Sequence, residues 1–486
     1  MKKIYLILLV LIGISISCTK DFEDFNTNKK RPTEVPGGML FANSQVALSD
    51  QQATPNVNLN IWRYISQYLT STTYLDEPNY DIVTRGISNL QYRTYYRDIL
   101  NDLKDAKAVI AAEVAVGEIA LAEQKNRICI VDLVEVYTYQ LLVDIFGDIP
   151  YTQALDITNL NPKYDDAFTI YKDLLERVNE DKAGLNDSYG SFGTDDQYYQ
   201  GDVAMWKKFA NTLKVRIAIN LADVDNTLAK TAIEEAFAGA FGPGENCQLV
   251  YPGGTFSNPL YEEMVASGRH DFVAANTIID AMKSLADPRL PLYFTLFETQ
   301  VEGQDTAYYI GGIYGTACPY TQYSHVAESI LDPAFPMVLL DYTELAFYLA
   351  EAAERGYSVG GTAADWYNYG VGSSIVHWGG TEADVVAYLS NPDVNYATAA
   401  GNWKQKIGTQ AWIAYYMRAT EGWTTWRRLD FPVLNLPPLP ETDDGKVPAR
   451  FSYPTNEQTL NATSYYEAAS AIGGDLMSTK LFWDKF

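Results

Sequence analysis

The chain has 486 residues, a formal net charge of −25 at pH 7 and charged residues at 20% of its positions. This excess of carboxylates repels phosphate backbones and no cluster of Lys or Arg offsets it, so the composition excludes nucleic acid as a partner. The length allows either one large core or two domains. Tyrosine is frequent, with 36 Tyr beside 19 Phe and 9 Trp. Because a Tyr ring has an apolar face and a hydroxyl, this bias favours a wet binding surface.

A leader of the bacterial lipoprotein type is predicted at the N-terminus. Lysines at 2–3 are followed by an apolar core at 4–14, which is too short to span a bilayer as a helix. The small Ser17 precedes Cys18, as at a site where a lipoprotein signal is cleaved and the cysteine thiol is acylated. The signal peptide, residues 1–17, would then be removed, and the mature chain would be tethered to a membrane rather than span it. An ordinary cleaved signal, without acylation, is the alternative.

A spacer and a helical body follow the leader. Residues 18–38 lack periodicity and carry turn residues, which predicts an acylated tether, and residues 39–486 are predicted to form an α-helical body. A longer helix at 119–146 is apolar over most of its circumference and should lie centrally. Before it, one helical stripe has apolar residues at i, i+4, i+7 and i+11, namely Ile99, Leu103, Ala106 and Ile110.

Amphipathic helices recur through the rest of the chain. They are predicted at 165–180, 203–221, 226–238, 271–285, 341–354, 363–376, 382–389, 402–416 and 456–469. Successive amphipathic helices with few strand signals predict an all-α fold of helical hairpins with minor β-structure. No strict repeat establishes a tetratricopeptide array from the sequence alone. Two segments, 246–269 and 291–336, break the helical pattern and are predicted as long irregular loops of functional rather than disordered character.

Cysteine and histidine give no sign of a metal centre. Beyond Cys18 the chain has Cys129, Cys247 and Cys318, an odd number without metal-ligand spacing. The three histidines are far apart in sequence and form no zinc-binding pattern, so we expect no metal and no cofactor. A Cys247–Cys318 disulfide is possible in an oxidising compartment, and two unpaired thiols are the alternative.

Short motifs along nearly the whole mature chain carry a family resemblance. They are F-G-D-I-P-Y at 146–151, W-K-K-F-A-N-T-L-K-V-R at 206–216, A-D-P-R-L at 286–290, Y-L-A-E-A at 348–352, Q-A-W-I-A at 410–414, W-R-R at 426–428 and P-A-R-F-S-Y-P at 448–454. In this order they resemble the SusD/RagB family, surface lipoproteins that work with TonB-dependent transporters in Bacteroidetes, and more narrowly its SusD-like branch. The resemblance implies a single α-helical domain over residues 39–486, with four tetratricopeptide-like helix pairs as a scaffold, loops that carry the ligand site, and no enzymatic activity.

Two tyrosine-rich regions are candidates for that ligand site. A carbohydrate needs flat apolar faces for the C–H patches of its rings and polar groups for its hydroxyls, which Tyr and Trp on loops supply together with Asp, Asn and Arg. The regions are 62–96 and the irregular segment 291–336, with Arg269 shortly before it. The predicted ligand-binding residues are Trp62, Tyr74, Asp76, Tyr80, Arg269, Tyr308, Tyr314 and Tyr320.

These features predict a lipoprotein anchored through Cys18 in the outer membrane and facing the exterior. Acidic residues at 21–24 resemble the tag that sends Bacteroidetes lipoproteins to that face. We expect the protein to bind an oligosaccharide and deliver it to a SusC-like TonB-dependent transporter. Capture of a peptide on the same architecture is one alternative. A glycoside hydrolase or lyase is another, but with 61 acidic residues a suitably spaced carboxylate pair is an unspecific signal, and no catalytic motif supports it.

Overall fold

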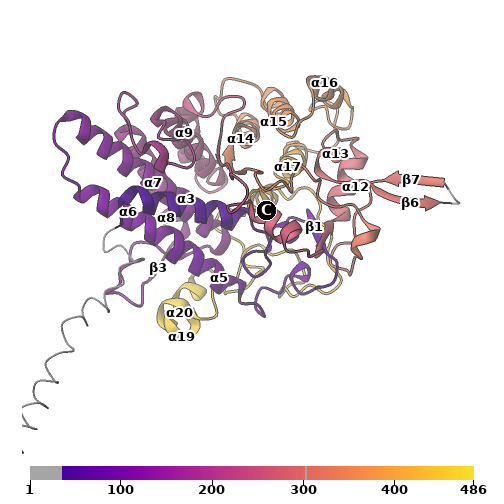
Figure 1. Cartoon of the computed structure of the whole chain (residues 1–486), viewed down its shortest axis with the longest axis horizontal. Helices are drawn as coiled ribbons and strands as arrows, with labels where there is room; N and C mark the ends of the chain where they lie inside the picture. The colour runs from indigo at the N-terminus through magenta and orange to yellow at the C-terminus, as the bar shows by residue number, and fades with distance from the viewer. Residues whose placement is uncertain (1–34, 302–303) are drawn as a thin grey trace, which may run out of the picture. The chain divides into compact units, whose positions relative to one another are not determined.

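Helices dominate the computed structural model, which describes residues 35–301 and 304–486 (Figure 1). The predicted signal peptide, Cys18 and most of the predicted tether lie outside these described residues. Helix α3 (Gly37–Ala53) opens the body, so the first helix includes the last two residues of the predicted tether. Within the described part, no helix has the length and apolar character needed to cross a membrane. The predicted all-α fold class is confirmed.

Many of the remaining helices lie where the sequence periodicity predicted them. In the first half they are α4 (Trp62–Ile65), α5 (Ile87–Arg93), the π-helix η2 (Thr94–Leu100), α6 (Asn101–Ala112), α7 (Glu118–Phe146), α8 (Ala167–Gly184), α9 (Val203–Asn220) and α10 (Asn226–Ala236). In the second half they are α11 (Pro259–Tyr261), α12 (Asn276–Ser284), α13 (Leu290–Tyr293), α14 (Tyr342–Glu354), α15 (Ala363–His377), α16 (Glu382–Ser390), α17 (Trp403–Ala414), α18 (Ala419–Leu429), α19 (Glu457–Leu460) and α20 (Ala462–Ala471).

Neighbouring helices pack in pairs like the hairpins of a tetratricopeptide scaffold. Helix α7 packs against α6 and α8, α9 against α10, α14 against α15, and α17 against α18. Helix α7 is central, as predicted, and residues 129–146 along it are buried except for Asp132. Two of its acidic residues share a partner, because Arg177 of α8 donates to Asp132 at 2.8 Å and to Glu135 at 2.7 Å. Pairing makes these carboxylates compatible with the interior.

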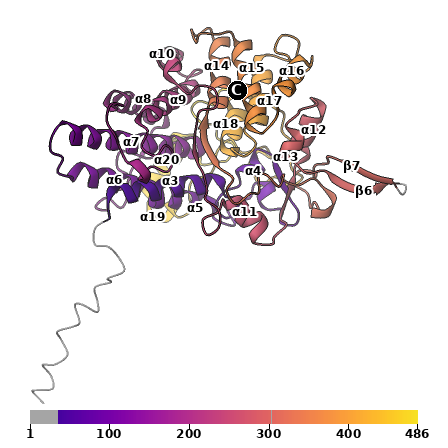
Figure 2. The same ribbon diagram turned by 45° about the horizontal axis from the view of Figure 1, so that its top comes forward.

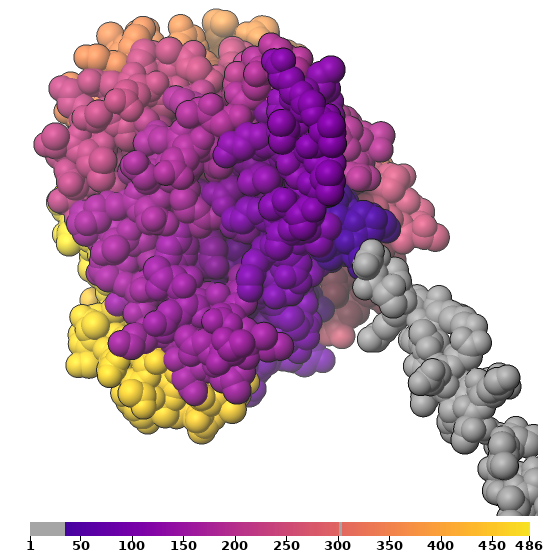
Figure 3. Space-filling model, turned by 90° about the vertical axis from the view of Figure 1, so that its left-hand side faces the viewer, coloured from indigo at the N-terminus to yellow at the C-terminus, as the bar shows by residue number. Residues whose placement is uncertain are grey.

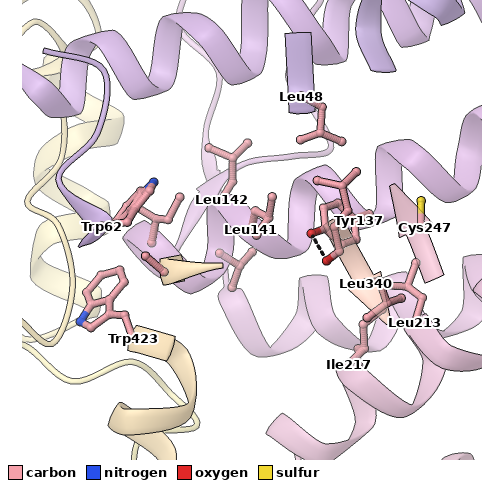
Figure 4. Packing of buried hydrophobic residues seen from close by; sticks show 14 of the residues in the cluster. Leu48, Trp62, Tyr137, Leu141, Leu142, Leu213, Ile217, Cys247, Leu340 and Trp423 are labelled. Atoms are coloured by element: carbon pink, nitrogen blue, oxygen red, sulfur yellow. Dashed lines mark hydrogen bonds between the residues drawn. The ribbon is translucent and has the colours of Figure 1, made fainter. Parts of the chain in front are cut away.

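The core joins segments that are distant in sequence. Figure 4 shows side chains of α3, α7, α9 and the β4–β8 ladder meeting around Tyr137, whose hydroxyl donates to the Leu339 carbonyl at 2.9 Å. On the other side of the same view, the rings of Trp62 and Trp423 lie side by side. The C-terminal segment also belongs to this interior, because the Trp483 indole N–H donates to Asp144 at 3.0 Å. Figure 3 shows the C-terminal segment, in yellow, packed beside the N-terminal helices.

Strands are short and occur as antiparallel two-stranded ladders. These are β1 (Leu69–Ser71) with β5 (Phe272–Ala274), β2 (Ile149–Pro150) with β3 (Tyr164–Asp165), β4 (Asn246–Leu249) with β8 (Met337–Asp341), and β6 (Phe297–Val301) with β7 (Gln304–Tyr308). The β6–β7 hairpin projects from the body in both ribbon views (Figures 1 and 2). The predicted helix at 271–285 begins only at Asn276, because residues 272–274 pair with β1 instead.

The cysteines of the described body are free thiols. Cys129, Cys247 and Cys318 are all buried and none forms a disulfide. Cys247 lies in the β4–β8 ladder, whereas the Cys318 thiol donates to the Ile313 carbonyl at 3.5 Å in a different loop. Of the two alternatives left open by the sequence, the structure therefore has the unpaired one.

Candidate functional site

A polar cleft of about 300 Å³ opens where the β1–β5 ladder ends. We call it the Tyr74 cleft, and its lining includes Asn56, Asn58, Tyr74, Glu77, Arg85, Glu263, Arg269 and Asp271. The ladder brings its loops together, since the Thr72 backbone N–H donates to the Asp271 carbonyl at 2.9 Å and the Thr72 hydroxyl to the His270 carbonyl at 2.8 Å. Two loops about 190 residues apart thereby face one solvent-filled space.

The polar side chains of the cleft hold one another in place. Arg269 donates to Asp271 at 2.5 Å, a hydrogen bond that raises the pKa of Arg269 and keeps it charged. Arg85 forms an ion pair with the buried Glu77, and Asn56 donates to Glu263 at 2.7 Å. Such a paired set presents donors and acceptors in fixed positions, as recognition of hydroxyl groups requires.

Tyr74 provides the apolar component of the cleft. Its side chain is 50% exposed, so part of the ring is available from solvent. An exposed aromatic ring beside fixed polar groups can pack on the C–H face of a sugar while its neighbours bond the hydroxyls. Tyr74 and Arg269 are the two predicted site residues that the structure brings together in this cleft.

Tyr320 lies in an aromatic stack beside the cleft. Its ring centroid is 4.2 Å from that of His270 and 3.7 Å from that of His325. The Tyr320 carbonyl also lies 2.6 Å from His325 Nε2, and burial lowers the pKa of His325, which favours the neutral imidazole at neutral pH. Because imidazoles stack on this ring, Tyr320 is a poor platform for a sugar, and the exposed His270 takes the outer position of the stack.

Three further predicted residues lie below the surface, where a ligand cannot reach them. Trp62 is 1% exposed, Tyr80 0% and Tyr314 2%. The Trp62 ring stacks on Phe451 at a centroid distance of 4.7 Å. The Tyr314 hydroxyl donates to the Tyr64 carbonyl at 2.7 Å, and the Tyr80 hydroxyl accepts from Gln67 at 3.2 Å. These side chains belong to the interior, because packing covers their rings and the hydroxyls of Tyr80 and Tyr314 form hydrogen bonds inside the protein.

The last two predicted residues are exposed but lie outside the lining of the cleft. Asp76 precedes the 3₁₀ turn η1 (Glu77–Asn79), on the same loop as Tyr74. Tyr308 ends β7, where its ring packs edge-on against Phe297 at 5.5 Å. The projecting hairpin therefore carries Tyr308 on an element separate from the cleft loops.

Several polar residues of the cleft were not among those predicted from the sequence. Asn56 and Asn58 precede the tyrosine-rich region, while Glu263 and Asp271 flank Arg269 in the chain. The one local signal that could have pointed to them is the pair of amides in Asn56-Val57-Asn58, a turn-forming run just before an apolar segment. The carboxylates carry no such signal, since only the β1–β5 pairing places them opposite Tyr74.

The structure is that of a helical protein with a polar cleft built from loops, and comparisons with known proteins identify its family. Residues 29–454 match the SusD-like family described as "Starch-binding associating with outer membrane". No curated protein matches the chain. The chain belongs to this SusD-like family, a carbohydrate-binding family associated with the outer membrane.

Solved structures agree with this assignment. A chitin-binding protein shares 26% identity over 93% of this chain and 100% of its own, with a TM-score of 0.78. A SusD homologue from Bacteroides uniformis shares 25% identity over 92% of this chain and 99% of its own, with a TM-score of 0.76. A chitin-binding SusD homologue from Flavobacterium johnsoniae shares 22% identity over 92% and 98%, with a TM-score of 0.76, and shows the fold alone.

Proposed function

We propose that this protein captures an oligosaccharide in the Tyr74 cleft at the cell surface and delivers it to a TonB-dependent outer-membrane transporter. The observation that carries the proposal is the meeting of an exposed Tyr74 ring with the fixed polar set around Arg269 in a chain of a carbohydrate-binding family. The similarity to a chitin-binding protein supports a glycan as the ligand. The protein acts by binding, without catalysis.

In the proposed mechanism, the body caps the transporter and traps the ligand before import. The sugar rings pack on Tyr74 while Arg269, Asp271 and the amides of Asn56 and Asn58 exchange hydrogen bonds with the hydroxyls. When the sugar leaves water, its hydroxyls lose their hydrogen bonds to water, and hydrogen bonds to these side chains replace them. Opening of the cap then releases the ligand toward the barrel.

Replacing Tyr74 by alanine should weaken oligosaccharide binding about tenfold, equivalent to about 1.4 kcal/mol. The physical reason is the loss of the exposed ring against which the sugar packs. Isothermal titration of the unacylated full chain with a chitin oligosaccharide and a maltooligosaccharide measures the change. Tyr466→Ala is the matched control, because Tyr466 is a 63% exposed tyrosine on α20, outside the cleft, and its loss should leave affinity unchanged.

The same titration separates the competing functions. Affinity for a peptide digest alone, with no response to either sugar, would favour peptide capture. Steady release of reducing ends from the sugars during the experiment, lost on replacing a single carboxylate, would show an enzyme. Equal sugar affinity in Tyr74→Ala and in the parent protein would contradict the placement of the ligand in this cleft.

The anchor is tested separately from the ligand. Cells fed radiolabelled palmitate should label the full-length protein and should fail to label Cys18→Ala, because acylation of the Cys18 thiol is the proposed tether. Cys129→Ser is the control, since Cys129 is a buried thiol of α7 and its loss should leave the label in place. Equal labelling of Cys18→Ala and the parent would contradict the lipoprotein proposal.

A further inference from the structure

A second concave surface lies on helices α15 and α16. It has a volume of about 790 Å³, larger than the Tyr74 cleft and within the usual range of ligand pockets. Asn368, Tyr369, Ser373 and His377 of α15 form its floor, and Glu382 of α16 stands at one wall. The loop before β4 and the start of α14 form the opposite side. We call this surface the α15 groove.

The α15 groove is separate from the Tyr74 cleft. The two share no lining residue. Both ribbon views place α15 and α16 on one side of the body, with α17 between them and the region of β1 and α4 (Figures 1 and 2). A ligand in one site therefore leaves the other free.

The floor of the groove lies where α15 and α16 approach closely. Gly372 lies between Asn368 and Val376 along α15, and a Cβ at this position would meet a Val385 methyl of α16 at 3.2 Å. The absence of a side chain there lets the two helices approach, and Gly372 and Ser373 line the groove between Tyr369 and His377. Val376, Val385 and Leu389 supply an apolar surface around this space.

Four polar side chains of the groove are not used by the fold. Among the residues that the structure describes, the side chains of Asn368, Tyr369, His377 and Glu382 have no hydrogen-bond partner, although all four line the groove. Three of them, the amide, the phenol and the imidazole, can both donate and accept. Tyr369 is 52% exposed and packs edge-on against Trp366 at 5.5 Å.

Charge restricts the ligands that this groove can take. Asp341 is paired with Arg418 at 2.9 Å, and Glu245 with Lys208, which leaves Glu382 as the carboxylate without a partner among the described residues. Among the described residues that line the groove, none is a Lys or Arg that could receive an anion. The combination of an aromatic ring, an apolar floor and groups that both donate and accept suits a neutral polyhydroxyl compound.

An adjoining hollow of about 270 Å³ extends the groove past His377. Asp341, Thr343 and His377 line both spaces, and the hollow adds Trp378 and Phe335, whose rings stack with centroids 6.1 Å apart. A linear ligand lying along the groove would thus pass from Tyr369 across His377 toward a second aromatic pair.

We propose that the α15 groove is a second binding site for a neutral oligosaccharide, independent of the Tyr74 cleft. Tyr369 contacts the sugar ring, and Asn368, His377 and Glu382 bond its hydroxyls. Two sites on one protein bind a long polysaccharide more tightly than either site alone, because the second contact forms at high effective concentration. The groove would hold the polymer at the surface while the cleft engages one segment of it.

The test uses the unacylated full chain with Tyr74→Ala as its parent, in which sugar binding in the Tyr74 cleft is expected to be about tenfold weaker, so that binding in the α15 groove is easier to separate from it. Isothermal titration with a chitin oligosaccharide and a maltooligosaccharide should show saturable binding of at least one, weakened about tenfold by the added Tyr369→Ala. Tyr466→Ala is the matched control, because it too is a helix-borne exposed tyrosine with an edge-on aromatic neighbour, Tyr465 at 5.0 Å. Hydrogen exchange should show sugar-dependent protection at 368–377 and 382–389.

Each result decides the proposal. It is overturned if no sugar binds the Tyr74→Ala parent, or if Tyr369→Ala and Tyr369→Ala combined with Glu382→Gln both bind like that parent. Sugar binding to the otherwise unmodified chain that is lost in Tyr369→Ala and unaffected by Tyr74→Ala would support the groove and contradict the proposed role of the cleft. The opposite pattern would support the cleft alone, so the two proposals can fail separately.

Discussion

Replacing Trp62 by alanine is expected to destabilise the protein by about 3–5 kcal/mol, since it removes a fully buried aromatic side chain. The ring is 1% exposed and lies against Phe451 at 4.7 Å and Trp423 at 5.3 Å. The substitution therefore removes buried apolar area and two stacked contacts. Figure 4 shows the ring of Trp62 beside that of Trp423 in this core. Equilibrium unfolding in urea, followed by tryptophan fluorescence and circular dichroism, measures the loss.

Two variants make the Trp62 result specific. Trp62→Phe should cost less, because it keeps an aromatic ring and removes an indole N–H that has no partner among the described residues. Tyr74→Ala should leave the free energy of unfolding within about 0.5 kcal/mol of the parent, as for other exposed positions. Unchanged stability of Trp62→Ala together with lost sugar binding would instead put Trp62 at the ligand, as the sequence predicted.

Replacing Glu344 by alanine is expected to lower the free energy of unfolding by about 3–5 kcal/mol, because it leaves buried positive charge without its partner. Glu344 is 0% exposed on α14 and accepts from Arg418 at 2.7 Å and from the Tyr348 hydroxyl at 2.7 Å. Arg216 of α9 lies 3.4 Å from the same carboxylate and also pairs with Glu421. This network joins α9, α14 and α18 through the interior.

Urea unfolding tests the Glu344 prediction against two controls. Glu344→Gln keeps an acceptor for Arg418 but removes the charge, and should fall between the parent and Glu344→Ala. Glu354→Ala removes an exposed carboxylate from the same helix and should cost less than about 1 kcal/mol. The prediction is contradicted if Glu344→Ala loses no more free energy of unfolding than Glu354→Ala. That result would mean that the remaining acidic residues, mainly Glu421, neutralise the guanidinium groups of Arg216 and Arg418.

Local periodicity was enough to predict most helices. The bounds of α7, α9, α14 and α15 agree with the predicted ranges to within a few residues. Helices α9, α14 and α15 repeat apolar residues at helical spacing, and α7 is apolar over most of its circumference. Helix α3 gave no such pattern. Its buried face includes polar side chains with distant partners, such as Gln45, which donates to Asp196 at 2.9 Å. A helix face of glutamine and serine cannot be recognised as buried until the hydrogen-bond partners of these side chains are known.

Helix α18 was missed for a related reason. The helix buries three charged residues, Glu421, Arg427 and Arg428. In a sequence, such residues normally indicate an exposed helix or a loop. They are stable there because the partners come from other elements, as where Arg428 donates twice to Glu351 of α14, at 2.9 and 2.8 Å. Likewise β5 replaced the start of a predicted helix because its hydrogen bonds are made to β1.

The sequence by itself determined the fold class and the family, because the hydrophobic period of each helix and the order of the motifs can be read directly from the amino-acid sequence. It also singled out Tyr74 and Arg269, which the structure places in one cleft. Only the tertiary structure decided which tyrosines are exposed. Tyr80 and Tyr314 are chemically the same as Tyr74, but they are buried by segments far away in the chain. Exposure is a property of packing between distant segments, and for an amphipathic residue such as Tyr, composition and loop position do not determine it.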